Sequence, residues 1–440
     1  MKLSTGVAYR KYILNDCIKI IIYNTHLELI LFLEDLSANL FEVLIGENPE
    51  RIENYAKSND ISCDDIQAFV NQLFSLGVFQ SDINNCDNGS DSNKTNDESQ
   101  LSNFIDELYA SGYVYAFHLD VTNKCNERCI HCYHPFDTYN YKNELNFKQI
   151  TTAIDYAYDL GVFEMTLSGG EIFARKDIFD ILEYISNKHM LITLYTNATL
   201  IDKVAIEKLK KYNIRKVSIS LYADISDIHD KITQVEGSFE NTISAIHLLK
   251  DNNFIVELKT VILKENYTRI NQMKKLANKY NANLILDFGL CGKLNGDCSV
   301  YDHRITNETL RSIFYSDPSY YCGNLSDYAD ITPNSEPCGA GKTSLYCSAD
   351  GNIYPCVSFR NKLCDYTQLK TIAQNESLIK WKSVRIKDFS DCFKHEYCNF
   401  CKEQCAGNNL IENHNYLNSK TSHCERAKII YEWFKQNEMR

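Results

Sequence analysis

Hydrophobic residues follow two different periods between residues 112 and 290 of this 440-residue chain. Short runs rich in β-branched and aromatic residues predict strands, and amphipathic stretches with helical spacing, such as Phe147–Leu160, lie between them. The expected strands are Val114–Val121, Glu164–Leu167, Leu191–Tyr195, Lys216–Leu221, Ile255–Ile262 and Asn283–Phe288. Six βα units in succession predict an α/β fold in which a parallel sheet curls into a partial barrel. Its site is expected at the carboxyl ends of the strands.

Residues 1–80 have a different pattern, which predicts a small winged-helix-like domain. Two apolar runs, Ile18–Tyr23 and Leu27–Leu33, predict a β-ribbon. Ser37 is the expected N-cap of a helix over Ala38–Ile45 that ends at Gly46. A last helix carries apolar residues at helical spacing, which are Ile66, Phe69, Val70 and Leu73.

Residues 81–103 are polar, acidic and almost free of large apolar side chains. Such a stretch cannot bury enough surface to order itself, so it is expected to be a disordered linker. The barrel is then expected over residues 104–290 and a third domain over residues 291–440.

Composition narrows the class of protein. The net charge of −12 argues against nucleic acid and anionic membrane surfaces as partners, because both attract basic patches. The sequence contains neither a signal-peptide pattern nor a long apolar run, so we expect a soluble, cytoplasmic protein. Since the cytosol keeps thiols reduced, metal ligation explains the eighteen cysteines better than disulfides do.

Cys125, Cys129 and Cys132 follow the first predicted barrel strand with the spacing C-x3-C-x2-C. Three thiolates on one loop can hold three irons of a [4Fe–4S] cluster and leave the fourth iron open to another ligand. A zinc knuckle or three unrelated thiols are the alternatives.

Ser168-Gly-Gly-Glu171 follows the second predicted strand, where two glycines allow close backbone approach and a carboxylate can accept from an amine. Together with the three cysteines, this segment resembles the radical SAM superfamily. In that family the open iron binds the amino and carboxylate groups of S-adenosylmethionine (SAM), and reductive cleavage of SAM yields a 5′-deoxyadenosyl radical. The resemblance implies that Gly169, Gly170 and Glu171 receive the methionine amine.

The same resemblance implies further SAM contacts. Tyr133 matches the aromatic residue beside the adenine, and Thr196, Asn197, Ser218 and Ser220 lie at strand ends where the family contacts the ribose and carboxylate. An ordinary strand-end role for these last four residues is the alternative. Relatives often carry an arginine after a His-Asp pair, whereas this chain has Lys231 after His229-Asp230, so that carboxylate contact is absent or made by another group.

Most cysteines lie in the last third of the chain. Cys338, Gly351 and Cys356 have the spacing C-x12-G-x4-C, and a late run of five cysteines follows at 392, 398, 401, 405 and 424. This arrangement resembles the SPASM extension of radical SAM peptide modifiers, which holds two auxiliary [4Fe–4S] clusters, so three clusters are implied in all. Here the x5 and x2 spacings of the late run are swapped, which leaves the ligand pairing open.

The family order implies that Cys338, Cys356 and Cys405 hold the first auxiliary cluster and that the second is held by Cys392, Cys398, Cys401 and Cys424. For the fourth ligand of the first cluster, Cys322 is the best candidate and Cys347 the next, and an iron left open to a substrate thiolate is a third option. The remaining cysteines are expected to be incidental or structural small apolar residues, namely Cys17, Cys63, Cys86, Cys291, Cys298 and Cys364.

The N-terminal pattern, with Leu36-Ser-Ala-Asn-Leu-Phe41, resembles the PqqD-like element that binds the leader of a precursor peptide as an added strand. The whole order resembles the sactisynthases, and Gly169–Phe173 and Cys338–Lys342 are close to the subtilosin-maturing type. The resemblance implies thioether formation between a cysteine sulfur and a carbon of a peptide, with flavodoxin or ferredoxin as reductant.

Three other functions stay open from the sequence. The same scaffold supports carbon–carbon crosslinking or epimerisation of a peptide. Anaerobic sulfatase maturation is less favoured, because that family has an aspartate directly after the cysteine where this chain has Val357. A non-enzymatic electron carrier has no use for an open iron.

Overall fold

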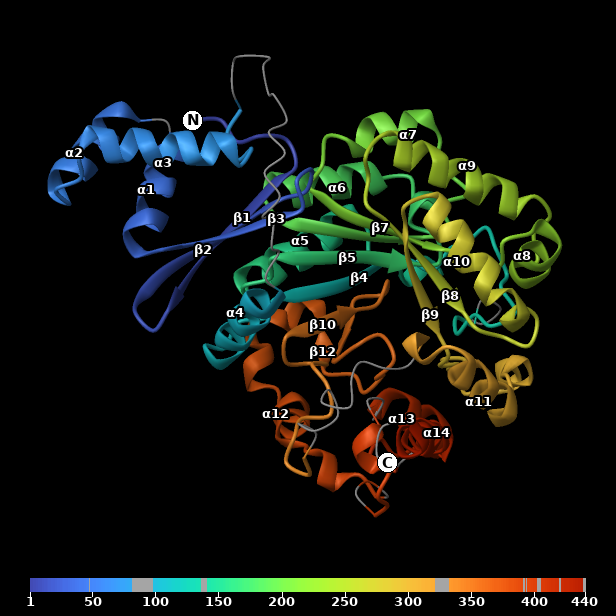
Figure 1. The fold of residues 1–440 in the computed structure, drawn as a ribbon. Coiled ribbons are helices and arrows are strands. Elements are labelled where there is room, and N and C mark those ends of the chain that lie inside the picture. Colours follow the sequence, from blue (N-terminus) through green and yellow to red (C-terminus); the bar gives the residue numbers. More distant parts are fainter. Residues whose placement is uncertain are drawn as a thin grey trace.

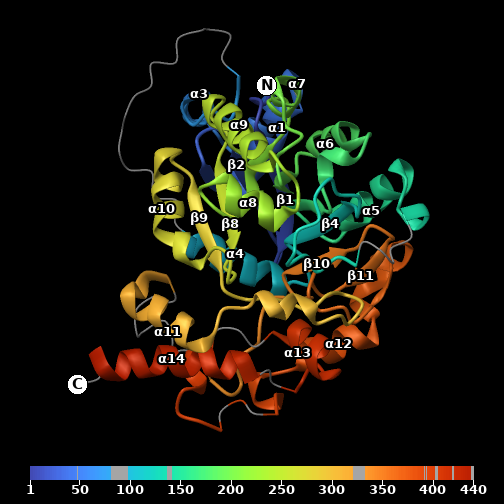
Figure 2. The ribbon, with the colours of Figure 1, turned by 90° about the vertical axis from the view of Figure 1, so that its right-hand side faces the viewer.

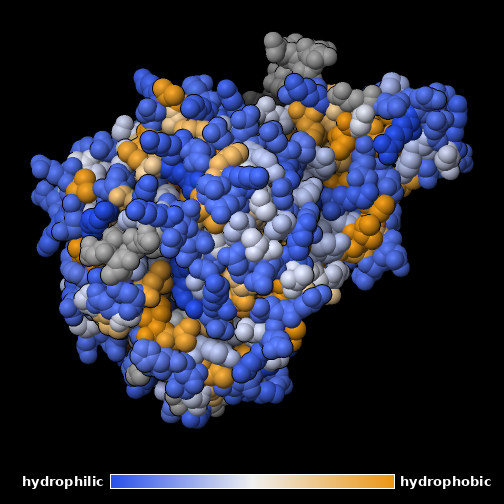
Figure 3. All heavy atoms as spheres, turned by 180° about the vertical axis from the view of Figure 1, so that it is seen from behind, coloured by the Kyte–Doolittle hydropathy of each residue, from blue (hydrophilic) through white to orange (hydrophobic). Residues whose placement is uncertain are grey.

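The computed structural model describes residues 1–46, 48–80, 98–135, 141–320, 332–390, 392, 394–401, 405–418 and 421–437. Figure 1 shows three regions, an N-terminal unit, a central α/β region and a C-terminal region. Among the helices in these ranges, none has the length and hydropathy needed to cross a membrane. On the face opposite to that of Figure 1, apolar side chains gather in several separate groups on a mostly polar surface (Figure 3).

The N-terminal unit is a three-stranded antiparallel sheet with three helices. Its elements are β1 (Val7–Leu14), β2 (Cys17–Asn24), β3 (Leu29–Glu34), α1 (Asp35–Ile45), α2 (Pro49–Ser58) and α3 (Cys63–Ser75). The predicted ribbon corresponds to β2 and β3, and the sequence pattern missed β1, whose apolar alternation is interrupted by Arg10 and Lys11. Ser37 is not the N-cap, because α1 begins two residues earlier and the Ser37 hydroxyl instead accepts from the backbone N–H of Glu34 at 3.1 Å.

The last part of the predicted linker is a helix, α4 (Glu98–Ala110), and residues 81–97 lie outside the described part. Phe104 of α4 packs on Phe32 of β3 with ring centroids 5.0 Å apart, and Lys19 forms an ion pair with Glu107 at 2.8 Å. The expectation of disorder was therefore wrong for residues 98–103, because this helix buries its apolar face against the N-terminal sheet.

All six expected barrel strands are present and pair in parallel in chain order. They are β4 (Ala116–Thr122), β5 (Glu164–Gly169), β6 (Leu191–Thr196), β7 (Ile214–Ser220), β8 (Val256–Val261) and β9 (Asn283–Asp287). The helices between them are α5 (Phe147–Asp159), α6 (Ile178–Asn187), α7 (Lys203–Leu209), α8 (Ser226–Thr233), α9 (Ser238–Asp251) and α10 (Ile270–Lys279). Figure 2 shows these helices on the outside of the curled sheet, which confirms the predicted fold class.

The C-terminal region extends the same sheet. Its described elements are α11 (Asn307–Ser316), β10 (Ser344–Cys347), β11 (Asn352–Tyr354), β12 (Cys364–Asp365), α12 (Glu376–Ser383), α13 (Ala406–Asn413) and α14 (Thr421–Asn437). β10 pairs in parallel with β4, and β11 and β12 follow it antiparallel, so the barrel's first strand is also the support of this region. In both ribbon views α13 and α14 lie on one side of the barrel, beneath β4 and β9 (Figures 1 and 2).

The N-terminal unit packs against the amino ends of the barrel strands. Arg10 of β1 is 8% exposed, donates to the carbonyls of Val162 (3.1 Å) and Tyr158, and lies 3.9 Å from the centroid of the Tyr158 ring. The backbone N–H of Tyr9 also donates to the carbonyl of His189, directly before β6, at 3.0 Å. The carboxyl ends of the strands thus remain at the opposite end of the barrel.

Replacing Arg10 by Met should lower the free energy of unfolding by about 2 kcal/mol, because two charge-assisted hydrogen bonds to buried carbonyls are lost. The measurement is urea unfolding followed by circular dichroism. Arg51→Met, at an exposed position of α2, is the matched control and should change little. Equal midpoints for the two variants would contradict the assigned contact.

Candidate functional site

The cysteine loop starts where β4 loses its regular pairing. The β4–β5 register shifts between Asp120 and Thr122, and the chain then leaves the sheet toward Cys125. On its far side the loop is held by backbone N–H groups of Arg128 and Ile130, which donate to carbonyls at the end of α8 at 3.0 Å each. The protein thus holds the loop from two sides.

Gly169 and Gly170 bring the backbone after β5 against this loop. The N–H groups of Gly170 and Glu171 donate to the carbonyls of Thr122 and Lys124 at 2.8 Å each. A Cβ at Gly169, whose φ is +139°, would lie 1.9 Å from the Thr122 oxygen, and one at Gly170 would lie 2.4 Å from the Lys124 oxygen. The sequence analysis predicted that these glycines let the backbone approach a ligand closely. In the structure the group that they approach is the backbone of the cysteine loop.

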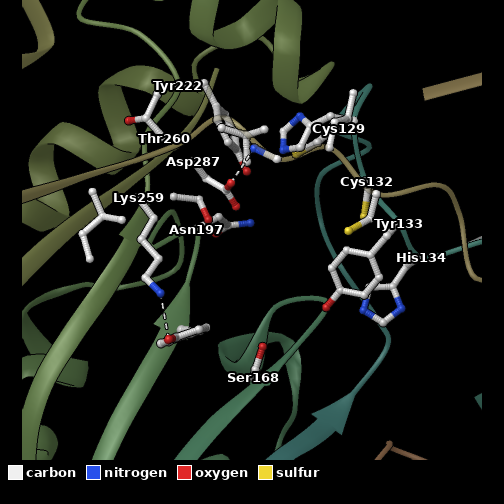
Figure 4. A pocket seen from close by; sticks show the side chains of 18 of the residues that line it. Cys129, Cys132, Tyr133, His134, Ser168, Asn197, Tyr222, Lys259, Thr260 and Asp287 are labelled. Atoms are coloured by element: carbon white, nitrogen blue, oxygen red, sulfur yellow. Dashed lines mark hydrogen bonds between the residues drawn. The ribbon is translucent and has the colours of Figure 1, made fainter. Parts of the chain in front are cut away.

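A cavity of about 580 Å³ lies at the carboxyl ends of the barrel strands (Figure 4). Nine of the predicted site residues line it, namely Cys125, Cys129, Cys132, Tyr133, Gly169, Gly170, Thr196, Asn197 and Ser220. Figure 4 shows Cys132 and Tyr133 on one wall and Lys259 across the cavity from them.

The sequence analysis missed several polar residues that line this cavity, namely Glu127, His131, His134, Tyr195, Tyr222, Lys259, Thr260, Asp287, Cys291, Ser358 and Arg426. Lys259, Thr260 and Asp287 end β8 and β9, so the strand-end rule that selected Asn197 would also have found them. Ser358 and Arg426 come from the C-terminal region, and no local pattern in the sequence indicates their position. Lys259 donates to the hydroxyl of Tyr195 at 2.7 Å.

Glu171 does not line the cavity. It is fully buried and accepts hydrogen bonds from the Thr196 hydroxyl (2.7 and 2.8 Å), from Asn197 N–H (2.7 Å) and from Phe173 N–H (3.0 Å). Burial raises the pKa of Glu171, and these donors oppose that rise. The carboxylate joins the end of β5 to the end of β6, and its contact to an amine stays a prediction.

Ser218 also lies outside the cavity lining. It is buried, and its hydroxyl donates to Glu257 at 2.9 Å, whereas Ser220 lines the cavity two residues later. Asn197 both lines the cavity and holds the cysteine loop, because its side-chain amide donates to Asn126 of that loop at 2.9 Å.

The His229-Asp230-Lys231 segment is structural. His229 Nδ1 accepts the backbone N–H of Tyr222 at 3.2 Å, and Asp230 caps the start of α9 through Gly237 N–H (2.7 Å) and Phe239 N–H (2.8 Å). Lys231 is not part of the cavity lining, where Lys259 and Arg426 supply the basic groups of the described residues.

The chemistry of the three loop thiols suits three corners of a [4Fe–4S] cluster whose fourth iron is left open. Burial raises the pKa of Cys125 to about 12 and that of Cys132 to about 11, and it also raises the pKa of Cys129 well above the ordinary value. Such thiols keep their protons at neutral pH unless a metal replaces them. Among the described residues no three His, Cys, Asp or Glu side chains converge on one ion, whereas the thiolates of a cubane bind different irons.

A second group of thiols lies in the C-terminal region and consists of Cys338, Cys356 and Cys405. Burial, together with smaller contributions from the charges of Cys405 and Cys338, raises the pKa of the Cys356 thiol to about 11, so the three lie within electrostatic reach of one another. Cys356 Sγ accepts Phe359 N–H at 3.2 Å, and Cys405 Sγ accepts Asn408 N–H at 3.5 Å. Backbone donors aimed at sulfur suit anionic thiolates.

A third group lies where the turn at Cys398–Phe400 packs on α14. Burial raises the pKa of Tyr397, and the thiols of Cys424 and Cys398 raise it further, so both lie near this ring. Cys401 N–H donates to the carbonyl of Cys398 at 3.1 Å. Cys392 packs against the main core, and its place in this group stays a prediction.

The candidates for a fourth ligand of the Cys338, Cys356 and Cys405 group differ in their surroundings. Cys322 lies outside the described residues. Cys347 is fully buried on β10, and burial together with Asp120, Asp350, Asp365 and Cys364 raises its pKa. The sulfur of Cys347 donates to the carbonyl of the neighbouring Ser348 at 3.5 Å.

Comparisons with known proteins agree with this geometry. Residues 119–277 match the family model of the radical SAM superfamily. The antilisterial bacteriocin subtilosin biosynthesis protein AlbA of Bacillus subtilis is 25% identical over 334 residues, which is 73% of this chain and 71% of that protein. The AdoMet-dependent heme synthase of Methanosarcina barkeri is 29% identical over 37% of this chain and 47% of that protein. The PqqA peptide cyclase of Gluconobacter oxydans is 24% identical over 54% of this chain and 68% of that protein.

Solved structures extend the likeness to nearly the whole chain. Streptococcus suis SuiB bound to S-adenosylmethionine has a TM-score of 0.58 at 17% identity and covers 96% of this chain and 99% of its own. SuiB bound to its precursor peptide SuiA has a TM-score of 0.59 at 17% identity, with the same coverage. The enzyme anSMEcpe with bound AdoMet has a TM-score of 0.58 at 16% identity and covers 73% of this chain and 93% of its own. The chain thus has the radical SAM fold, and residues 119–277 form a radical SAM domain.

Replacing Gly170 by Ala should abolish assembly of the cluster in the cysteine loop, because the new methyl group would collide with the Lys124 carbonyl. Iron analysis after anaerobic reconstitution should show a loss of about four irons per chain. Gly46→Ala is the control, because φ there is −70° and the nearest contact is 3.4 Å. Full iron content in the Gly170 variant would show that the loop does not need this close approach.

His229 should make stability depend on pH. Burial lowers its pKa from 6.5 to about 4, so its contribution is fully present above pH 6.5 and is lost as the pH falls through 4. His229→Asn keeps an acceptor for Tyr222 and removes the titration. Between pH 7 and pH 4 the unfolding free energy of the wild type should therefore fall by about 3 kcal/mol more than that of the variant.

The measurement for His229 is urea unfolding at a series of pH values. His414→Asn, at an exposed position, is the matched control and should leave the pH dependence unchanged. Parallel stability curves for the wild type and the His229 variant would rule out a titrating role for this residue.

Proposed function

We propose that this protein is a radical SAM maturase that joins a cysteine sulfur to a carbon within a ribosomally made peptide. The observation that carries the proposal is the second thiol group, Cys338, Cys356 and Cys405, close behind the cavity that the SAM-binding loop lines. Ser358 is two residues from Cys356 and lines this cavity itself. The likeness to a subtilosin biosynthesis protein over 73% of the chain supports thioether formation.

The cavity residues divide the work of binding and shielding. Cys125, Cys129 and Cys132 would hold a [4Fe–4S] cluster, which together with bound SAM supplies a hydrogen-abstracting radical. Gly169 and Gly170 fix the loop that carries it. Val261, Ile285, Leu286, Phe288 and Leu290 form an apolar wall that keeps water and stray hydrogen donors from the reacting carbon.

The charged groups in the cavity would orient the peptide. Lys259 and its partner Tyr195 lie on the barrel side, and Arg426 enters from α14.

Cys338, Cys356 and Cys405 would hold a first auxiliary cluster, and Cys392, Cys398, Cys401 and Cys424 would hold a second. Flavodoxin or ferredoxin is the reductant we expect.

The N-terminal unit would bind the leader of the precursor peptide. In the described part of the chain β3 pairs with β2 on one edge only, which leaves its other edge for an added strand. This unit packs at the amino ends of the barrel strands, whereas the cavity lies at their carboxyl ends. A barrel strand of 7 residues, such as β4, spans roughly 23 Å at about 3.3 Å per residue, so the leader segment and the modified residue must be at least about seven extended residues apart.

Carbon–carbon crosslinking is the second candidate, and it is favoured by the likeness to the PqqA peptide cyclase over 54% of the chain. The two reactions differ in their products. A thioether consumes one thiol per crosslink, whereas a carbon–carbon bond leaves every thiol reactive.

Anaerobic incubation of the reduced protein with SAM and a cysteine-rich precursor peptide should give a product that lacks one pair of hydrogen atoms per crosslink. Mass spectrometry before and after thiol alkylation measures both the hydrogen loss and the thiols consumed. Cys132→Ala should reduce 5′-deoxyadenosine and product to background, and Cys298→Ala, at an exposed position, should leave both unchanged. SAM cleavage with an unmodified peptide, or a crosslink with all thiols intact, would exclude thioether formation.

A further inference from the structure

Cys291 lies between the barrel and the C-terminal thiols. It follows the end of β9 by four residues, is partly buried and lines the cavity. Burial raises the pKa of Tyr133, and the charges of Asp120, Cys132 and Cys291 add to the rise, so Cys291 is also near the wall formed by the cysteine loop. The sequence pattern had predicted only a small structural residue at this position.

One buried residue connects Cys291 with the second thiol group. Asn408 is 8% exposed, and its side-chain oxygen lies 2.7 Å from Cys291 Sγ. The backbone N–H of the same residue donates to Cys405 Sγ at 3.5 Å. The sulfurs of Cys291 and Cys405 therefore both contact Asn408.

The start of α13 brings the remaining parts together. Cys405 is the N-cap of this helix, so its sulfur lies at the positive end of the helix dipole, which favours anionic ligands. A Cβ at Gly407 would lie 2.4 Å from the backbone carbon of Ser358, so the first turn of α13 presses on the turn that follows Cys356. Gly292 packs the next part of the barrel segment against the same helix, because a Cβ there would lie 3.0 Å from Ile411.

We propose that Cys291 is the fourth ligand of the first auxiliary cluster, with Cys338, Cys356 and Cys405 as the other three. The inference rests on the proposed function only in requiring that this cluster be present. Cys347 is the other described candidate for this position, but it is fully buried on β10, its sulfur donates to the carbonyl of Ser348 at 3.5 Å, and it does not line the cavity. A cluster bound by four thiolates of the chain leaves no iron open to a substrate thiolate, and the ligand Cys291 places its edge at the cavity wall.

The experiment uses the full chain in which Cys125, Cys129 and Cys132 are replaced by alanine, so that the auxiliary clusters are seen alone. This background should bind roughly eight irons per chain, as two [4Fe–4S] clusters require. Cys291→Ala and Cys291→Ser are added to it and are compared with the control Cys298→Ala and the competitor Cys322→Ala. Iron and sulfide analysis, Mössbauer spectra and EPR spectra of the reduced proteins are recorded with and without added 2-mercaptoethanol.

Cys291→Ala should change the EPR signal of one cluster and produce a distinct single-iron component in the Mössbauer spectrum. Added 2-mercaptoethanol should shift this signal back toward that of the background protein, because an exogenous thiolate can occupy the opened iron. The background protein and Cys298→Ala should not respond to the thiol. Cys291→Ser should keep the iron and shift the signal through an oxygen ligand, which separates ligation from a loss of folding.

Unchanged spectra in both Cys291 variants would overturn the assignment. A thiol-responsive iron in Cys322→Ala but not in the Cys291 variants would also overturn it. Background protein that binds no auxiliary iron would instead contradict the proposed function, so the two failures are distinguishable.

Discussion

The structure depends on the contact between two backbone segments at the carboxyl end of the barrel. The residues after β5 lie directly on the loop after β4, and two hydrogen bonds of 2.8 Å hold them together. Only glycine fits at positions 169 and 170, because a side chain would overlap the carbonyls of the partner segment. This contact holds the loop that carries Cys125, Cys129 and Cys132, all of which line one cavity. The packing of backbone against backbone is therefore enough to require glycine at both positions, independently of any contact to SAM.

Two carboxylates, the buried Glu171 and the half-buried Asp230, brace this end of the barrel. Glu171 joins β5 to β6 through donors from Thr196 and Asn197, and Asp230 caps α9. In both cases groups of the protein itself donate to the carboxylate oxygens. The cavity itself keeps other polar groups, among them Lys259 from the barrel and Arg426 from the C-terminal region.

The sheet of the partial barrel is extended by strands that are distant in sequence. β10 pairs with β4 in parallel, which makes the strand that starts the cysteine loop also the attachment point of the C-terminal thiols. The cavity therefore has one wall from the cysteine loop and another from the segment around Ser358. The cavity thus lies between the cysteine loop and the segment that follows Cys356, and Cys291 also lines it.

The sequence by itself determined the strands and helices of the barrel and the position of the cysteine loop after its first strand. The six barrel strands could be predicted because period-two apolar runs and intervening amphipathic helices are local properties of the chain. β1 was missed since Arg10, a polar residue in the pattern, is buried through bonds to carbonyls of the barrel. The roles of Glu171 and Ser218, the start of α4 and the position of Cys291 were decided only by the tertiary structure. Each of them depends on hydrogen bonds or packing between segments far apart in the chain, which no local spacing encodes.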